Sequence, residues 1–217
     1  MNPWGHEYLT EEAIKAALTK LPQGLDWIRH FVADVGTGSV YRDSEDVFTL
    51  GHWRNSGQRH HFMRYAGQGE KSAYLEGCDW IYRNAYQASG NLRRIWKEKL
   101  GHYNVVFVTE PLGNALHALQ DSYALAHCMR RKVGDTAVIY KINVYDEQNK
   151  KPGPNWPGHS VLDAQYKDGL GKEAIIASRE LIRIVIHCSL VKEDVMFEPK
   201  WRSLWQTFAG IFLSTSL

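Results

Sequence analysis

The segment Leu112–Cys128, LGNALHALQDSYALAHC, constrains this chain most, because it sets metal-ligand side chains at helical spacing in an apolar run. Side chains at i and i+4 lie above one another on an α-helix, so His117 and Asp121 can bind one ion from the same face. His127 lies six residues beyond Asp121, about 9 Å along a continuing helix and well round its circumference. We therefore expect His127 to serve a second ion.

The same segment is compatible with a helix that only packs a core, its polar residues solvated on the flanks. The rest of the chain favours the metal interpretation because it supplies further ligand types. The other candidate ligands, in chain order, are His6, Asp34, His61, His159 and Asp163. Together the five histidines and three carboxylates fit three zinc ions. Zinc takes about four N or O donors, a carboxylate can bridge two ions, and water completes the set.

The order of these residues resembles a known superfamily. The pattern LGxxLHxLxDxxxxxH followed by HxxxD is similar to that of the zinc-dependent phospholipase C and single-strand-specific nuclease superfamily. The match spans His6 to Asp163, and the central motif is its most specific part. Members hold three zinc ions in the cleft of an all-helical fold. The resemblance therefore implies one all-α, multi-helix domain over residues 1–217, with room for a small β-hairpin insertion.

Carried over residue by residue, the resemblance assigns ligands to three zinc ions. One ion takes Asp34, His61, His117 and Asp121, a second takes His127, His159 and Asp163, and the third takes His6, the bridging Asp121 and the N-terminus. Family members begin with a Trp that binds zinc, whereas Trp4 here lies inside the chain, two residues before His6. A retained Met1 amine is the expected ligand in its place. Asp34 is expected also to orient or deprotonate the attacking water.

Two of these ligand positions have competitors. The interval between Asp34 and His61 also contains Asp43, Asp46, His52 and His60. We prefer Asp34 because FVAD resembles the family's Ala-Asp turn, and His61 because the Phe that follows it matches the family pattern. Asp163 stands where the phospholipase branch has Glu and the nuclease branch has Asp.

The resemblance implies a zinc-dependent phosphodiester hydrolase whose substrate class stays open. We expect a phospholipase C that cleaves phospholipid head groups at a membrane surface; the alternative is a single-strand-specific nuclease or 3'-nucleotidase. Aromatic side chains at the cleft mouth would contact acyl chains or stack on bases. The candidates are Trp4, Phe62, Tyr65, Tyr123 and Trp156. A degenerate binding protein that keeps metal only structurally is a third hypothesis, disfavoured by the nearly complete ligand set.

Composition excludes some other classes. The 217 residues suit one domain with a substantial core, and 44% hydrophobic with 23% charged residues is ordinary for a globular protein. The net charge of +2 is too small to indicate a duplex-binding protein, which is expected to show a clustered basic stripe. Three cysteines without a CxxC motif favour structural thiols. The sequence shows neither a Sec leader nor a long apolar stretch, so we expect the chain to be cytoplasmic as synthesised. The alternative is an effector that is exported by a route other than Sec.

Periodicity predicts the other elements. Helices are expected over residues 10–21, 70–88, 92–100, 173–191 and 201–212, with Thr10 as a cap and Gly90 as a break. Alternation over 137–145 predicts a strand, which we pair with the turn-rich segment 146–158. The basic run 130–132 is interpreted as a solvated helix end, and the segment VVFV as a loop or part of the central helix. The broad apolar face of the last helix is expected to pack in the core rather than on a membrane.

Overall fold

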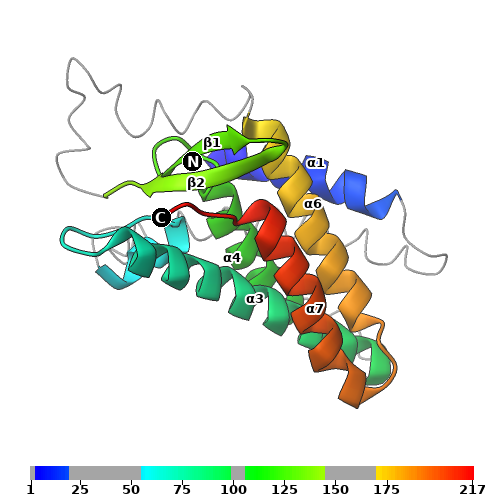
Figure 1. Ribbon diagram of the computed structural model, residues 1–217. Helices are drawn as coiled ribbons and strands as arrows, with labels where there is room; N and C mark the ends of the chain where they lie inside the picture. The colour runs from blue at the N-terminus through cyan, green and yellow to red at the C-terminus, as the bar shows by residue number, and fades with distance from the viewer. Residues whose placement is uncertain (1–2, 20–54, 99–105, 145–169) are drawn as a thin grey trace.

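A computed structural model of the chain describes residues 3–19, 55–98, 106–144 and 170–217. This part is mostly helical, with a small antiparallel hairpin across one end of the helices (Figure 1). Its five α-helices are α1 Pro3–Leu18, α3 Glu70–Glu98, α4 Val106–Asp121, α6 Leu170–Ser189 and α7 Asp194–Phe212. A 3-10 helix, η3, covers Asn55–His61, and strands β1 and β2 cover Cys128–Val133 and Thr136–Ile142. The prediction of a mostly helical fold with a small hairpin is confirmed.

Helix α4 lies at the centre of the helical packing. It contacts α1, α3 and α6, and nearly all of its residues from Val108 onward are buried. The small side chains of Ala115 and Ala118 allow close approach of the neighbouring helices, while Leu116 and Leu119 fill the core between them. A helix that is apolar on all sides is expected to be enclosed in this way. The polar side chains of α4 other than the exposed Glu110 therefore lie inside the protein.

The first turns of α4 include residues 106–109, so this part of the VVFV segment joins the central helix, one of the two outcomes expected for it. Pro111 lies inside the helix and has no N–H to donate to the carbonyl of Phe107. Asn91 Nδ2 of α3 donates to that carbonyl at 2.6 Å instead. The proline is therefore accommodated by a side chain from the neighbouring helix.

Two predicted helix boundaries are wrong. Helix α3 runs without a break through Gly90, because tertiary contacts on this part of the helix outweigh the cost of about 1 kcal/mol for a helical glycine. One such contact is the hydrogen bond from Ser89 Oγ to the carbonyl of Val185 at 2.8 Å. Helix α1 begins at Pro3, and Thr10 is a buried mid-helix residue rather than a cap.

The predicted strand is present as β2, and its partner in the described residues is one that the sequence did not predict. β2 pairs with the preceding β1, which contains the basic run assigned to a helix end. The turn between them is two residues long, and Gly134 adopts the left-handed conformation that such turns require, with φ of 61°. The C-terminal segment adds to β2, since Ile139 exchanges main-chain hydrogen bonds with Ser214 and Ser216, both at 2.9 Å. Residues 146–158 lie outside the described part.

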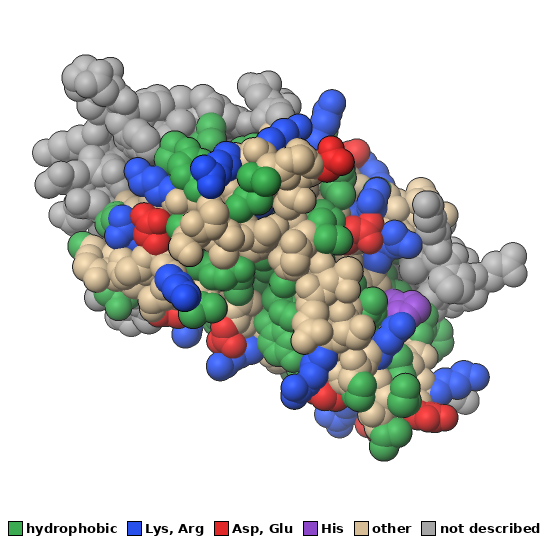
Figure 2. Space-filling model, in the orientation of Figure 1, with side chains coloured by type: hydrophobic (Ala, Val, Ile, Leu, Met, Phe, Trp, Pro, Cys, Tyr) green, Lys and Arg blue, Asp and Glu red, His purple; other side chains and the backbone are tan. Residues whose placement is uncertain are grey.

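The last helix, α7, packs as expected of a core helix. Its buried Trp201 meets the rings of Tyr82 and Tyr86 edge to face, at centroid distances of 6.0 and 5.5 Å. Among the described helices none is both long and apolar enough to cross a bilayer. On the face shown in Figure 2, basic side chains lie among acidic and hydrophobic ones rather than in a stripe. The thiols of Cys78, Cys128 and Cys188 are free, as structural thiols would be.

Candidate metal centre

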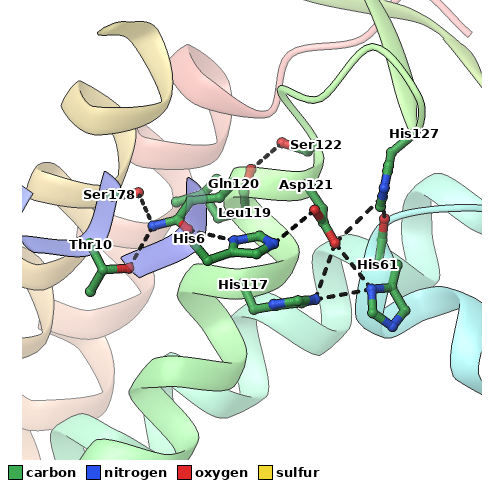
Figure 3. A network of polar contacts seen from close by, with 10 residues as sticks. All are labelled: His6, Thr10, His61, His117, Leu119, Gln120, Asp121, Ser122, His127 and Ser178. Atoms are coloured by element: carbon green, nitrogen blue, oxygen red, sulfur yellow. Dashed lines mark hydrogen bonds and ion pairs between the residues drawn. The ribbon is translucent and has the colours of Figure 1, made fainter. Parts of the chain in front are cut away.

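Asp121 is the last residue of α4, and its carboxylate lies among four imidazole rings (Figure 3). His117 comes from the preceding turn of the same helix and His6 from α1. His61 ends η3, and His127 precedes β1. All five side chains are almost completely buried. The fold therefore brings together ligand-type residues that are distant in the sequence.

Three of the donor atoms form a nearly equilateral triangle. His61 Nδ1 lies 3.0 Å from His117 Nε2 and 3.1 Å from Asp121 Oδ2, and the third side, from His117 Nε2 to Asp121 Oδ2, is 3.2 Å. A tetrahedral zinc ion with bonds of about 2.0–2.1 Å separates its ligand atoms by about 3.3–3.4 Å. The three atoms are therefore spaced almost as one face of a zinc tetrahedron.

The other carboxylate oxygen of Asp121 faces His6. His6 Nε2 lies 3.2 Å from Asp121 Oδ1, and the His6 ring stacks on that of His117 at a centroid distance of 4.1 Å. One ligand atom each from His6, His117 and Asp121 lie within 4.8 Å of one another, so this group could hold a metal ion. Because each oxygen of Asp121 faces a different histidine, its carboxylate has the arrangement of a bridging ligand.

His127 reaches this carboxylate because α4 ends earlier than predicted. The expectation that the helix continues to His127 is wrong, since residues 122–127 form turns. His127 Nδ1 lies 3.4 Å from Asp121 Oδ2 and 2.6 Å from the main-chain oxygen of His61. A carbonyl oxygen only accepts, so Nδ1 donates to it and Nε2 carries the lone pair of the neutral ring. The assignment of His127 to a second ion therefore no longer follows from spacing and rests on the resemblance alone.

The turn that carries His127 is fixed by Asn143, which follows β2. Asn143 Nδ2 donates to the carbonyls of Leu125 and Ala126 at 2.9 and 3.0 Å. The main-chain N–H of Asn143 donates to the carbonyl of His127 at 2.8 Å. Asn143 therefore supports the site by holding the backbone that positions His127. Sequence reasoning missed it, and its only signal was an amide residue at the end of a strand pattern.

The charge of Asp121 follows from its surroundings. Burial alone would raise the pKa of its carboxyl, but the electrostatic interaction with the histidines around it, His127 foremost, holds this pKa well below the ordinary value. The carboxylate is therefore ionised at neutral pH and accepts hydrogen bonds or binds cations. Nitrogen donors combined with a single carboxylate suit zinc and similar transition metals, whereas calcium and magnesium prefer all-oxygen sites.

The predicted site residues fall into two groups. The structure brings together five of them: His6, His61, His117, Asp121 and His127. The other four predicted residues, Met1, Asp34, His159 and Asp163, lie outside the described residues, as do the competitors Asp43, Asp46 and His52. The remaining competitor, His60, stacks on the ring of Trp80 at 4.1 Å. The geometry therefore favours His61 over His60 at this position.

Two of the aromatic candidates for the cleft mouth do not lie there. Phe62 is fully buried against Tyr74 and Gly77, and Tyr123 is buried beneath the guanidinium of Arg130. Neither ring is exposed to contact an acyl chain or a base, so this prediction is wrong for both. Trp156 and the side chain of Trp4 lie outside the part of the chain that the structure describes.

Fold and site together define a mostly helical protein with a buried histidine and carboxylate group that could hold a metal ion. A scan against protein-family models found no match, and searches of curated proteins and of solved structures also found none.

Proposed function

We propose that this chain is a zinc-dependent phosphodiester hydrolase with three zinc ions, and that its substrates are phospholipids, as for a phospholipase C. The observation that carries the proposal is the triangle of His61, His117 and Asp121, with His6 on the second oxygen of Asp121. The resemblance in the central motif supports the same assignment, because it gives the three triangle residues to one zinc ion.

The residues present fit zinc in chemistry as well as spacing. His61 and His117 contribute neutral nitrogen donors, and the ionised Asp121 contributes an oxygen to each side of the group. When bound, zinc supplies Lewis acidity that favours deprotonation of water near neutral pH and offsets charge developing on a phosphodiester. Burial of the donors keeps their geometry fixed and lowers the local dielectric, which strengthens their interaction with a cation.

The attacking water requires a base or an orienting acceptor. We assign this role to Asp34, which lies outside the described residues. Replacement by Asn keeps an oxygen ligand but removes the basic carboxylate. Asp34→Asn should therefore leave zinc largely bound and remove most of the turnover, whereas full activity in this variant would rule out the role.

The test is a side-by-side assay of the zinc-loaded protein. Vesicles of phosphatidylcholine and of phosphatidylethanolamine are compared with single-stranded DNA and RNA, while metal content is measured by mass spectrometry. We expect release of the phosphorylated head group, loss on chelation and recovery with zinc. Cleavage of nucleic acid instead would replace the phospholipase assignment with the nuclease of the same resemblance. Metal binding without turnover of any of these substrates would support the third hypothesis, a binding protein that keeps metal only structurally.

Two histidine variants make the assay specific to the site. His117→Ala removes a ligand shared by both sides of the group and should lower metal content and turnover together. His187→Ala changes an exposed histidine of α6 and should leave both unchanged. A wild-type chain that binds no zinc, or a His117→Ala variant that keeps full metal content, would overturn the proposal.

A further inference from the structure

Gln120 lies next to Asp121 at the end of α4, and its side chain joins three helices (Figure 3). Its Oε1 lies 2.7 Å from His6 Nδ1 of α1. Its Nε2 donates to Thr10 Oγ1 of α1 at 2.9 Å and to Ser178 Oγ of α6 at 3.4 Å. All of these side chains are fully buried. Both N–H groups of the amide and its oxygen thus have partners inside the protein.

This arrangement fixes where His6 carries its proton. An amide oxygen only accepts hydrogen bonds, so His6 Nδ1 must donate to Gln120. The lone pair of the neutral ring then lies on Nε2, which is the atom 3.2 Å from Asp121 Oδ1. A nitrogen lone pair and a carboxylate oxygen are both acceptors and repel one another unless a second proton on the ring or a metal ion lies between them. The contacts of Gln120 therefore prepare the Nε2 side of His6 for a metal ion.

The opposite orientation of the amide would have the opposite effect. Were Nε2 of Gln120 to face His6, the ring would accept on Nδ1 and carry its proton on Nε2, where it would donate to Asp121. His6 and Asp121 would then satisfy each other without a metal. In the structure it is Oε1 that faces His6, while Nε2 donates to the hydroxyls of Thr10 and Ser178.

We propose that Gln120 is a positioning residue that holds His6 as an Nε2 ligand. Partners that hydrogen-bond the second nitrogen of a ligating histidine typically contribute about 10–100-fold to metal affinity. The inference rests on the proposed metal site, but it is independent of which phosphodiester is the substrate.

The first test locates the proton of His6 by nitrogen-15 NMR on the metal-free full chain. We expect a proton on Nδ1 that exchanges slowly with water in the wild type, and loss of this signal in Gln120→Met. A wild-type His6 that carries its proton on Nε2 alone would overturn the inference. This readout does not depend on metal or turnover, so a chain that holds no zinc would overturn the proposed function while the proton position still decides the inference.

The second test measures zinc affinity by competition with a chromophoric chelator. Gln120→Met keeps the size of the side chain but removes its acceptor, and should weaken zinc binding by about 10–100-fold. Gln120→Glu keeps an acceptor for His6 Nδ1 and should retain affinity near that of the wild type. The inference would be overturned if Gln120→Met bound zinc as tightly as the wild type. It would also be overturned if both variants lost the same zinc affinity while their urea unfolding midpoints stayed unchanged. His187→Ala changes an exposed histidine of α6 outside this group and is the control, with affinity unchanged.

Discussion

Gly77 of α3 lies directly against the ring of Phe62, the residue that follows His61. A methyl group at this position would lie 2.6 Å from Phe62 Cδ2 and 2.8 Å from Cε2, whereas carbon atoms pack at about 3.5–4.0 Å. Phe62 cannot easily withdraw, because it is fully buried and its backbone adopts a left-handed φ of 51° that is rare for a bulky side chain. Gly77→Ala should therefore strain the segment that carries His61.

The expected magnitude is the difference of two opposing contributions. Overpacking of this kind costs about 1–3 kcal/mol, and replacing a helical glycine by alanine recovers about 0.5–1 kcal/mol. We expect Gly77→Ala to lower the free energy of unfolding by about 1–2 kcal/mol, measured by urea titration. A methyl group at Gly90 of the same helix would meet no atom of the described residues within 4 Å, so Gly90→Ala should stabilise by about 0.5–1 kcal/mol.

Replacement by alanine is therefore expected to change the free energy of unfolding in opposite directions at the two glycines. In a Phe62→Ala background the obstacle to Gly77→Ala is gone, and that substitution should become stabilising, as at Gly90. Zinc affinity provides a second readout, since only the Gly77 variant displaces the chain next to His61. If Gly77→Ala and Gly90→Ala stabilise the protein equally, the packing argument is refuted.

Three further predictions concern other parts of the molecule. Arg130 donates to the main-chain carbonyls of Ser122, Ala137 and Phe212, so Arg130→Met should lower the free energy of unfolding, measured in urea, by about 3 kcal/mol. Hydrogen bonds from Lys97 and Arg93 lower the pKa of Asp194 to about 2. The stability that this carboxylate contributes should therefore be lost as pH falls from about 4 towards 2. Asp194→Asn should remove this pH dependence of stability in acid titrations. Burial raises the pKa of Cys78 to about 12 and of Cys188 to about 11, so a disulfide reagent at pH 8 should label the native chain at least about tenfold more slowly than the denatured one.

Much of the fold was predictable where one local pattern dominates. The amphipathic repeat over 173–191 corresponds to α6, and the alternation over 137–145 corresponds to β2. The error at Gly90 could not be avoided from local rules, because the contacts that keep α3 continuous come from α6 and α7. The partner of β2 was missed for a similar reason. The segment CMRRKV has the charge of a helix end, and only pairing across the Gly134 turn makes it a strand.

In the site, the i, i+4 spacing of His117 and Asp121 was sufficient to place them on one face of a helix. The position of His127 was not predictable from spacing, because the helix ends at Asp121 for tertiary reasons. Carbonyls beyond this point are taken by distant side chains: Arg130 Nε donates to the carbonyl of Ser122 at 2.8 Å, and Asn143 to those of the two residues before His127. Local helix propensity contains no information about such partners.

The contacts around Asp121 support our proposal of a metal site over a buried polar core. In a core, the imidazole N–H groups would point at the carboxylate and satisfy it. Here His6 and His127 direct their Nδ1 protons to oxygen atoms elsewhere, at 2.7 and 2.6 Å. The three edges of the triangle of His61, His117 and Asp121 are all of hydrogen-bond length, 3.0–3.2 Å. A proton on one of the nitrogen atoms can form a hydrogen bond along only one of these edges. A single cation coordinated by all three atoms satisfies them at once, which is why we assign this group to metal binding.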